Sequence, residues 1–324
     1  MPVLMRFNQI LPGLEPKLMA ARHAAMLEMA SFADDNGFFG VSLEEHHGAE
    51  NGWSPSPMLL AGMIIARTKN LHASISALLV PLHDPLRVAE DLAVLDLASG
   101  GRVSTIGGIG YRPQEYAAHG KDWATRGALM DECVEVLLKA WTGEPFAYRG
   151  TTVRVTPKPL SQPHPTFMLG GTSRVAVRRA ARYGLMFFAA AHSPELEPYY
   201  YEQCQAFGTQ GFFMAAAPDT TMVHVADDPD RVWAEYGHCF LHEASTYAGW
   251  QTPDIRSAVH SHARTVEDLR AEGIYQVITP AECAARAGAQ GADKNFLLHP
   301  LCGGMPIDQA WSSVELFTAA ALGR

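Results

Sequence analysis

The chain is poor in cysteine and in basic residues, and each shortage excludes a class of protein. Five cysteines among 324 residues show no CxxC spacing, and an odd, dispersed set indicates reduced thiols rather than a disulfide framework. The formal net charge is -9, whereas a nucleic-acid-binding domain normally carries a basic face. We therefore expect a cytoplasmic protein that does not bind nucleic acid.

Long apolar runs are also missing. No uncharged apolar segment reaches the length of a membrane span, and Arg6 and Asn8 interrupt the apolar N-terminus where a signal peptide would need a continuous hydrophobic stretch. The sequence therefore predicts neither a membrane partner nor a secretory signal.

The chain does have a regular alternation of short apolar runs and amphipathic segments. We expect strands at residues 3–10, 38–43, 71–80, 103–106, 166–169, 185–189, 221–226 and 296–301, with helices between them. This alternation predicts parallel strands joined by right-handed crossovers. A closed (β/α)8 TIM barrel is the fold we expect. A doubly wound open sheet is the alternative, weakened because no GxGxxG follows the first strand.

Two segments depart from this alternation. Residues 144–157 are typical of a small β-hairpin outside the main sheet, and residues 238–295 form a less regular, polar stretch near the seventh strand. We find no linker composition and no short-period repeat, so residues 1–324 are expected to form a single barrel domain.

The most informative segment is Glu44-Glu45-His46-His47, which directly follows the second predicted strand. Four ionisable groups are costly to bury without partners, but a loop at the mouth of a barrel can direct them at a ligand. We expect a functional role for His46, whereas Glu44 on its own is expected on a solvated turn.

A second candidate site is the turn Gly170-Gly171-Thr172-Ser173, which joins the fifth strand to a helix. Backbone N–H groups at a helix N-terminus, together with hydroxyl groups, favour phosphate. Arg126 begins another helix and offers a charged partner for the same phosphate. The alternatives are an ordinary glycine turn and an exposed arginine.

A metal centre is not expected. His238, Cys239 and His242 have a helical spacing that metal ligands use, but no HExxH pattern accompanies them. Neighbouring side chains on an extended chain point to opposite faces, so His46 and His47 cannot readily bind one ion together. A metal-dependent barrel hydrolase therefore remains only an alternative.

The order of motifs along the whole chain resembles the bacterial luciferase-like superfamily of flavin-dependent monooxygenases and F420-dependent oxidoreductases. The resemblance depends on an ordered set of segments that is strongest from about residue 38 to 138: Leu43 to His47, Ala66 to Leu71, Leu79 to Pro85, Val88 to Asp96, Ser99 to Arg102, Gly107 to Gly110 and the helix at Arg126. It implies a (β/α)8 barrel with an insertion near the seventh strand, so residues 238–295 would be a lid.

The resemblance also implies residue roles. His46 would assist catalysis beside the flavin, and Glu45 would orient it. A non-prolyl cis peptide at Ser76-Ala77 would lie against the flavin ring. The cofactor-binding residues would be Ser76, Ala77, Gly108, Ile109, Arg126, Gly170, Gly171, Thr172 and Ser173. The family's phosphate-binding arginine after strand four has no counterpart near Ile109, and Arg112 is a substitute candidate.

The expected function is that of a two-component monooxygenase, which receives reduced FMN from a partner flavin reductase and uses O2 on a small organic substrate. The alternative is an F420-dependent hydride-transfer oxidoreductase, and a non-catalytic flavin-binding protein is a further competitor. A homodimer is expected from the resemblance alone. An apolar substrate is suggested by four aromatic residues expected in the pocket: Trp53, Tyr111, Phe188 and Trp250.

Overall fold

The structure is a computed structural model that describes residues 2–217, 220–251, 261–289 and 295–324. The strands are β1 (Val3–Phe7), β2 (Gly40–Leu43), β3 (His72–Leu79), β4 (Val103–Gly108), β5 (Phe146–Tyr148), β6 (Thr151–Val153), β7 (Thr166–Gly171), β8 (Met186–Ala189), β9 (Phe213–Met214), β10 (Met222–Val225), β11 (Tyr275–Ile278) and β12 (Phe296–Leu298). Ten of them form one sheet in the order β11-β10-β12-β1-β2-β3-β4-β7-β8-β9.

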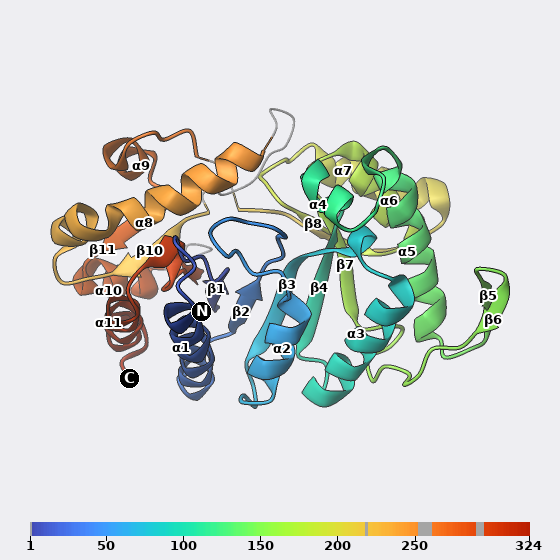
Figure 1. Ribbon diagram of the computed structural model, residues 1–324, viewed down its shortest axis with the longest axis horizontal. Helices are drawn as coiled ribbons and strands as arrows, with labels where there is room; N and C mark the ends of the chain where they lie inside the picture. Colours follow the sequence, from blue (N-terminus) through green and yellow to red (C-terminus); the bar gives the residue numbers. More distant parts are fainter. Residues whose placement is uncertain (1, 218–219, 252–260, 290–294) are drawn as a thin grey trace.

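Helices surround this sheet (Figure 1). They are α1 (Pro16–Asp35), α2 (Pro57–Ile65), α3 (Pro85–Ser99), α4 (Pro113–Ala118), α5 (Arg126–Trp141), α6 (Arg174–Tyr183), α7 (Leu196–Phe207), α8 (Pro229–Trp250), α9 (Val266–Glu272), α10 (Pro280–Gly288) and α11 (Ile307–Phe317). Within the described part of the chain, no helix has both the length and the apolarity needed to cross a membrane.

The strand ladders confirm the predicted α/β architecture. Every ladder in the large sheet is parallel, and all eight predicted strands belong to it. The sequence reading missed the short strands β9 and β11, which occupy the two ends of the sheet order. Among the described residues no ladder joins these two strands, so the barrel is open between them. The expected hairpin, β5–β6, forms a separate two-stranded sheet that projects from the main body in Figure 1.

The stretch 238–295 is more regular than its composition predicts. It contains the second half of α8, then α9, β11 and α10, and β11 extends the sheet by pairing with β10. Residues 252–260 and 290–294 of the expected lid lie outside the described residues. The role of this stretch as a lid therefore stays a prediction.

Local signals in the sequence account for several element boundaries. Asp84 accepts the backbone N–H of Leu86 and caps α3, which begins with Pro85 at a position where its missing N–H is tolerated. At the end of α1, Asn36 is followed by Gly37 with a φ of 75°, a left-handed conformation that glycine adopts without steric cost.

A buried ion network connects the first strands to α8. Arg6 on β1 is buried and forms salt bridges with Glu44, which follows β2, and with Glu243 on α8. The solvated turn predicted for Glu44 is therefore wrong, because the guanidinium group holds its carboxylate with two N–H groups. His299 also contacts Glu243, with 3.2 Å between Nδ1 and Oε2.

The pKa of Glu243 is a consequence of this network. Burial alone would raise it, but the charges of Arg6 and His299 together with hydrogen bonds outweigh that effect and lower the pKa from its ordinary value. A carboxylate with a lowered folded-state pKa stabilises the fold above its unfolded pKa of about 4.3, and this stability is lost as the pH falls towards the folded value.

Replacing Glu243 by Gln is expected to lower the free energy of unfolding at pH 7 by about 3–5 kcal/mol, because Arg6 keeps its buried charge while losing one of its two partners. The variant should also lose less stability than the wild type on acidification below about pH 4, since the titrating carboxylate is gone.

Urea unfolding at neutral and acidic pH measures both effects. Glu235→Gln is the matched control, because Glu235 forms an exposed ion pair with Arg231 on the same helix and such pairs contribute about 1 kcal/mol or less. Equal stability of the two variants would contradict the structural role of the network.

Candidate functional site

The predicted site residues gather at one edge of the sheet. In parallel strands all carboxyl ends meet at the same edge, which is where barrel proteins bind ligands. Glu45 and His46 follow β2, and Ser76 and Ala77 lie in β3. Gly108 ends β4 and Ile109 follows it, while Gly170 and Gly171 end β7 and lead into Thr172 and Ser173. Arg126 is the first residue of α5.

The imidazole of His46 is held at both nitrogens. Its Nδ1 lies 3.0 Å from Oε1 of Glu115, and its Nε2 lies 3.0 Å from the hydroxyl of Tyr111. An ionised carboxylate can only accept, so Nδ1 carries a proton and, in the neutral ring, Nε2 accepts from the Tyr111 hydroxyl. The side chain is only 7 % exposed, so these two contacts decide the orientation of the ring.

Glu115 on α4 organises this part of the site. One of its oxygens, Oε1, accepts from Nδ1 of His46 at 3.0 Å, from the backbone N–H of His47 at 2.9 Å and from Arg112 at 3.0 Å. Burial acts to raise the pKa of Glu115, but the His46 contact and the other donors outweigh it and lower the pKa. The sequence reading did not identify Glu115 because it lies on the short helix α4, which had been missed; its side chain is 1 % exposed.

Aromatic rings enclose His46. Trp53 meets the imidazole edge-on at a centroid distance of 5.1 Å, Trp250 lies at 4.8 Å, and Tyr247 at 6.5 Å. The guanidinium of Arg112 lies over the ring of Trp250, with its Cζ 4.1 Å from the ring centroid. Tyr247 and Trp250 belong to the last turn of α8, which therefore covers His46.

Three of the four aromatic residues expected in a substrate pocket are in this cluster. Trp53, Tyr111 and Trp250 all contact His46, whereas Phe188 lies on β8, three places beyond β3 in the sheet order. Burial, followed by the neighbouring Tyr247, raises the pKa of Tyr111 well above its ordinary value.

The expected pairing of Glu45 with His46 is wrong. Glu45 accepts instead from His47 at 2.9 Å and from His83 at 2.6 Å, both through Oε1, while its second oxygen accepts the backbone N–H of Leu79. The adjacent side chains of Glu45 and His46 turn to different sides of the segment, Glu45 towards His83 and His46 towards Glu115. Burial would raise the pKa of Glu45, but these hydrogen bonds lower it to about 2.

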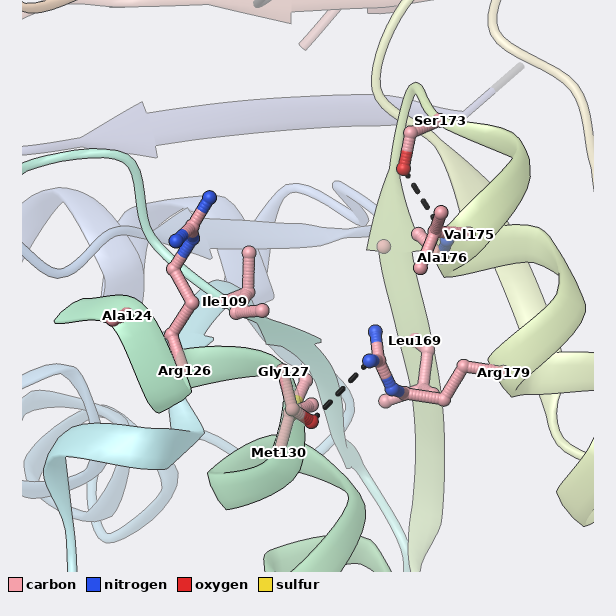
Figure 2. A pocket seen from close by; sticks show the side chains of 11 residues that line it. Ile109, Ala124, Arg126, Gly127, Met130, Leu169, Ser173, Val175, Ala176 and Arg179 are labelled. Atoms are coloured by element: carbon pink, nitrogen blue, oxygen red, sulfur yellow. Dashed lines mark hydrogen bonds between the residues drawn. The ribbon is translucent and has the colours of Figure 1, made fainter. Parts of the chain in front are cut away.

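A second feature is a cavity of about 430 Å³ between the carboxyl ends of β4 and β7. Four of the predicted cofactor residues line it: Ile109, Arg126, Gly170 and Ser173. Figure 2 shows Arg126 at the start of α5 on one side of this space, with Ser173 and Arg179 of α6 on the other.

The charges around this cavity differ in how far they are neutralised. Arg126 stacks on the ring of Trp123 at 4.0 Å and donates to that residue's carbonyl, and neither contact cancels its charge. Arg179, which the sequence reading did not single out, forms a salt bridge with Asp131 at 2.7 Å. Ser173 caps α6 by accepting the N–H of Ala176, so the N-terminus of α6 also faces this region.

The remaining predicted cofactor residues are not among those that line the cavity. The peptide bond between Ser76 and Ala77 is cis, as the resemblance implied, and the pairing of β3 with β4 shifts at this point. A Cβ on Gly108 would lie 2.8 Å from Cβ of Ala77, so the two strands approach closely there. Gly171 has a φ of 153°, which only glycine adopts readily.

Arg112 is not among the residues that line this cavity. Its guanidinium is engaged by Glu115 and by the carbonyl of His47, which places it on the His46 side of the site. Arg126 and Arg179 are the arginines that line the cavity, and a phosphate contact of Arg112 stays a prediction.

The fold and the position of the site together define an α/β barrel protein whose polar residues collect at the carboxyl ends of parallel strands. The sequence pattern of the luciferase-like monooxygenase family matches residues 5–298. The chain belongs to this family.

Individual relatives agree with this assignment. The FMNH2-dependent dimethylsulfone monooxygenase of Pseudomonas putida is 28% identical over 180 residues, a match that covers 52% of this chain and 49% of that protein. The chain spans about half the length of the curated relatives it matches.

Solved structures share the fold over nearly the whole chain. The oxygenating constituent of 3,6-diketocamphane monooxygenase from Pseudomonas putida, in complex with FMN, has a TM-score of 0.72 at 19% identity and covers 98% of this chain and 96% of its own. An F420-dependent secondary alcohol dehydrogenase has a TM-score of 0.64 at 18% identity and covers 99% of each chain.

Replacing Glu115 by Gln is expected to destabilise the protein by about 1–3 kcal/mol, because three donors lose a buried carboxylate acceptor. It should also free the His46 ring to reorient. Urea unfolding measures the first effect, and the imidazole NMR signals of His46 measure the second. Glu132→Gln is the control, since the Glu132 carboxylate accepts an exposed hydrogen bond from the hydroxyl of Tyr148. A Glu115→Gln variant with wild-type stability and an unchanged His46 signal would show that the carboxylate does not hold the ring.

Proposed function

We propose that this protein is a flavin-dependent oxidoreductase of the two-component type, which uses reduced FMN and O2 to oxidise a small apolar organic substrate. The observation that carries the proposal is the cavity between β4 and β7. It is lined by Arg126 and by Ser173 at the N-terminus of α6, the two groups that the sequence predicts as phosphate contacts. Family membership and the FMN complex of a structural neighbour support it.

The residues present fit a phosphate-bearing cofactor. Arg126 keeps its charge beside the cavity, and the N-terminus of α6 adds backbone N–H groups and a favourable dipole. Gly170 and Gly171 lack side chains where the cofactor would pass closest to β7. We propose that Arg126, Ser173 and these glycines, flanked by Thr172 and Ile109, hold the phosphate and the adjoining chain.

The ring system would then extend from this cavity towards β3 and β2. Ser76 and Ala77, with Gly108 packed against Ala77, would form the surface beneath it. When bound, the flavin supplies the redox chemistry, and the protein provides binding, orientation and a dry environment.

His46 is the residue proposed to act beside the ring. Its Nδ1 proton is fixed by Glu115, so Nε2 is the atom that can accept or return a proton at the cofactor's edge. Trp53, Tyr247 and Trp250 would exclude water from this atom. Glu45 acts on the other face of the loop, so its proposed role is to hold the loop rather than the ring.

An F420-dependent hydride-transfer oxidoreductase is the second candidate, because an F420-dependent dehydrogenase shares the fold over the whole chain. The reductase partner, the homodimer, the lid role of residues 238–295 and the cytoplasmic location remain parts of this proposal that follow from the resemblance and the composition.

Anaerobic titration of the purified protein with FMNH2 and with reduced F420, followed by fluorescence or calorimetry, tests the proposal. We expect tight binding of FMNH2, and Arg126→Ala should weaken it about 10- to 100-fold, the effect of losing a charge-assisted contact. Reduced riboflavin, which has no phosphate, should bind wild type and variant equally.

Arg149→Ala is the control, because Arg149 lies on the β5–β6 hairpin and pairs with Asp84. Preference for F420 would establish the second candidate. Binding of neither cofactor would refute the flavin proposal and return the metal-dependent hydrolase to consideration.

Replacing His46 by Ala is expected to lower turnover by about 10²- to 10⁴-fold, the usual contribution of a positioned acid–base group, while the affinity for reduced flavin changes little. Turnover is measured as substrate-dependent O2 consumption with reductase-supplied flavin. His72→Ala, at the opposite end of β3, is the control. Equal losses of turnover and of affinity in His46→Ala would argue for a binding role alone.

A further inference from the structure

A cluster of metal-binding groups lies on the face of the loop opposite His46. The side chains of Glu45 and His47, two residues apart after β2, meet each other, and His83 joins them from the end of the 3-10 turn Val80–Leu82. The ligand atoms of these three side chains lie within 4.8 Å of one another. We propose that Glu45, His47 and His83 form a binding site for a divalent transition-metal ion such as Zn²⁺.

The geometry of the cluster supports this site. Nε2 of His47 and Nε2 of His83 both point at one oxygen of Glu45, at 2.9 Å and 2.6 Å. An ion between them needs the three atoms to separate only slightly, since Zn²⁺ binds nitrogen and oxygen ligands at about 2.0–2.2 Å. Two imidazoles and one carboxylate suit Zn²⁺ and related first-row metals better than Mg²⁺ or Ca²⁺.

The surroundings of the cluster also suit a metal site. Glu45 is fully buried, and its other oxygen is fixed by the backbone N–H of Leu79, an outer contact of the kind that orients metal ligands. The side chains of His47 and His83 are 15% and 24% exposed. Water therefore has access to the ligands, and can complete the coordination of the ion.

The second convergent group in the described residues, Glu243 with His299 and Cys302, does not qualify in the same way. The guanidinium of Arg6 already bonds the carboxylate of Glu243, and a divalent cation there would meet a fixed positive charge. The carboxylate of Glu45 instead bonds two imidazoles and one backbone N–H.

Such an ion would clamp the loop behind the active site. It would tie the segment after β2 to the end of β3 without touching His46, whose side chain faces the other way. Because its ligands Glu45 and His47 flank His46 in the sequence, the ion would restrict the backbone of His46. This inference is independent of the proposed function, and it is measured without any flavin.

The test uses untagged protein dialysed against a chelator and then titrated with Zn²⁺ by calorimetry, and with Co²⁺ by visible absorption. We expect one equivalent to bind, with Co²⁺ bands of nitrogen ligation. His83→Ala and Glu45→Gln should each weaken binding at least about 10-fold, because each removes one of three protein ligands. His192→Ala is the control, since His192 is an exposed histidine outside the cluster.

Binding that is absent in the wild type, or equal in wild type and His83→Ala, would overturn the proposal and leave the cluster as a hydrogen-bond network. Circular dichroism checks that the variants are folded. Should His83→Ala fail this check, His83→Gln replaces it, and the Co²⁺ spectrum of the wild type decides independently: a spectrum like that of the hydrated ion would also overturn the site.

Discussion

The geometry of the site depends on the salt bridges of the buried Arg6 guanidinium. This group stands between Glu44 after β2 and Glu243 on α8, two elements far apart in the sequence. Removing one carboxylate would leave a buried charge without a full set of partners, which costs several kcal/mol. The network thus fixes α8 over the strand ends, and with it the rings of Tyr247 and Trp250 that cover His46.

Successive side chains of the segment after β2 contact different parts of the protein. Glu44 pairs with Arg6 of β1, and His46 contacts Glu115 of α4. Glu45 and His47 face the end of β3, where they meet His83. All four consecutive ionisable residues therefore have partners, which offset the cost of burying them. The same contacts hold the imidazole of His46 in one orientation.

Much of this arrangement could be predicted from the sequence. The parallel fold followed from the alternation of apolar runs with helical segments, and the cis peptide at Ser76-Ala77 followed from the resemblance. Contacts between distant residues could not be predicted. Glu115 lies 69 positions from His46 on a six-residue helix, which is too short for a periodic signal. The predicted contact of Glu45 with His46 was wrong because neighbours in the sequence need not point to the same side of the chain.

A crystal structure of the protein with bound FMN would test the account most directly, because it places both ends of the cofactor at once. The account predicts the phosphate within hydrogen-bonding distance of Arg126 and Ser173, in the cavity between β4 and β7, and the ring edge beside Nε2 of His46 with the Ser76–Ala77 peptide beneath it. A flavin whose phosphate lies elsewhere, or whose ring is separated from His46 by the aromatic cluster, would contradict it.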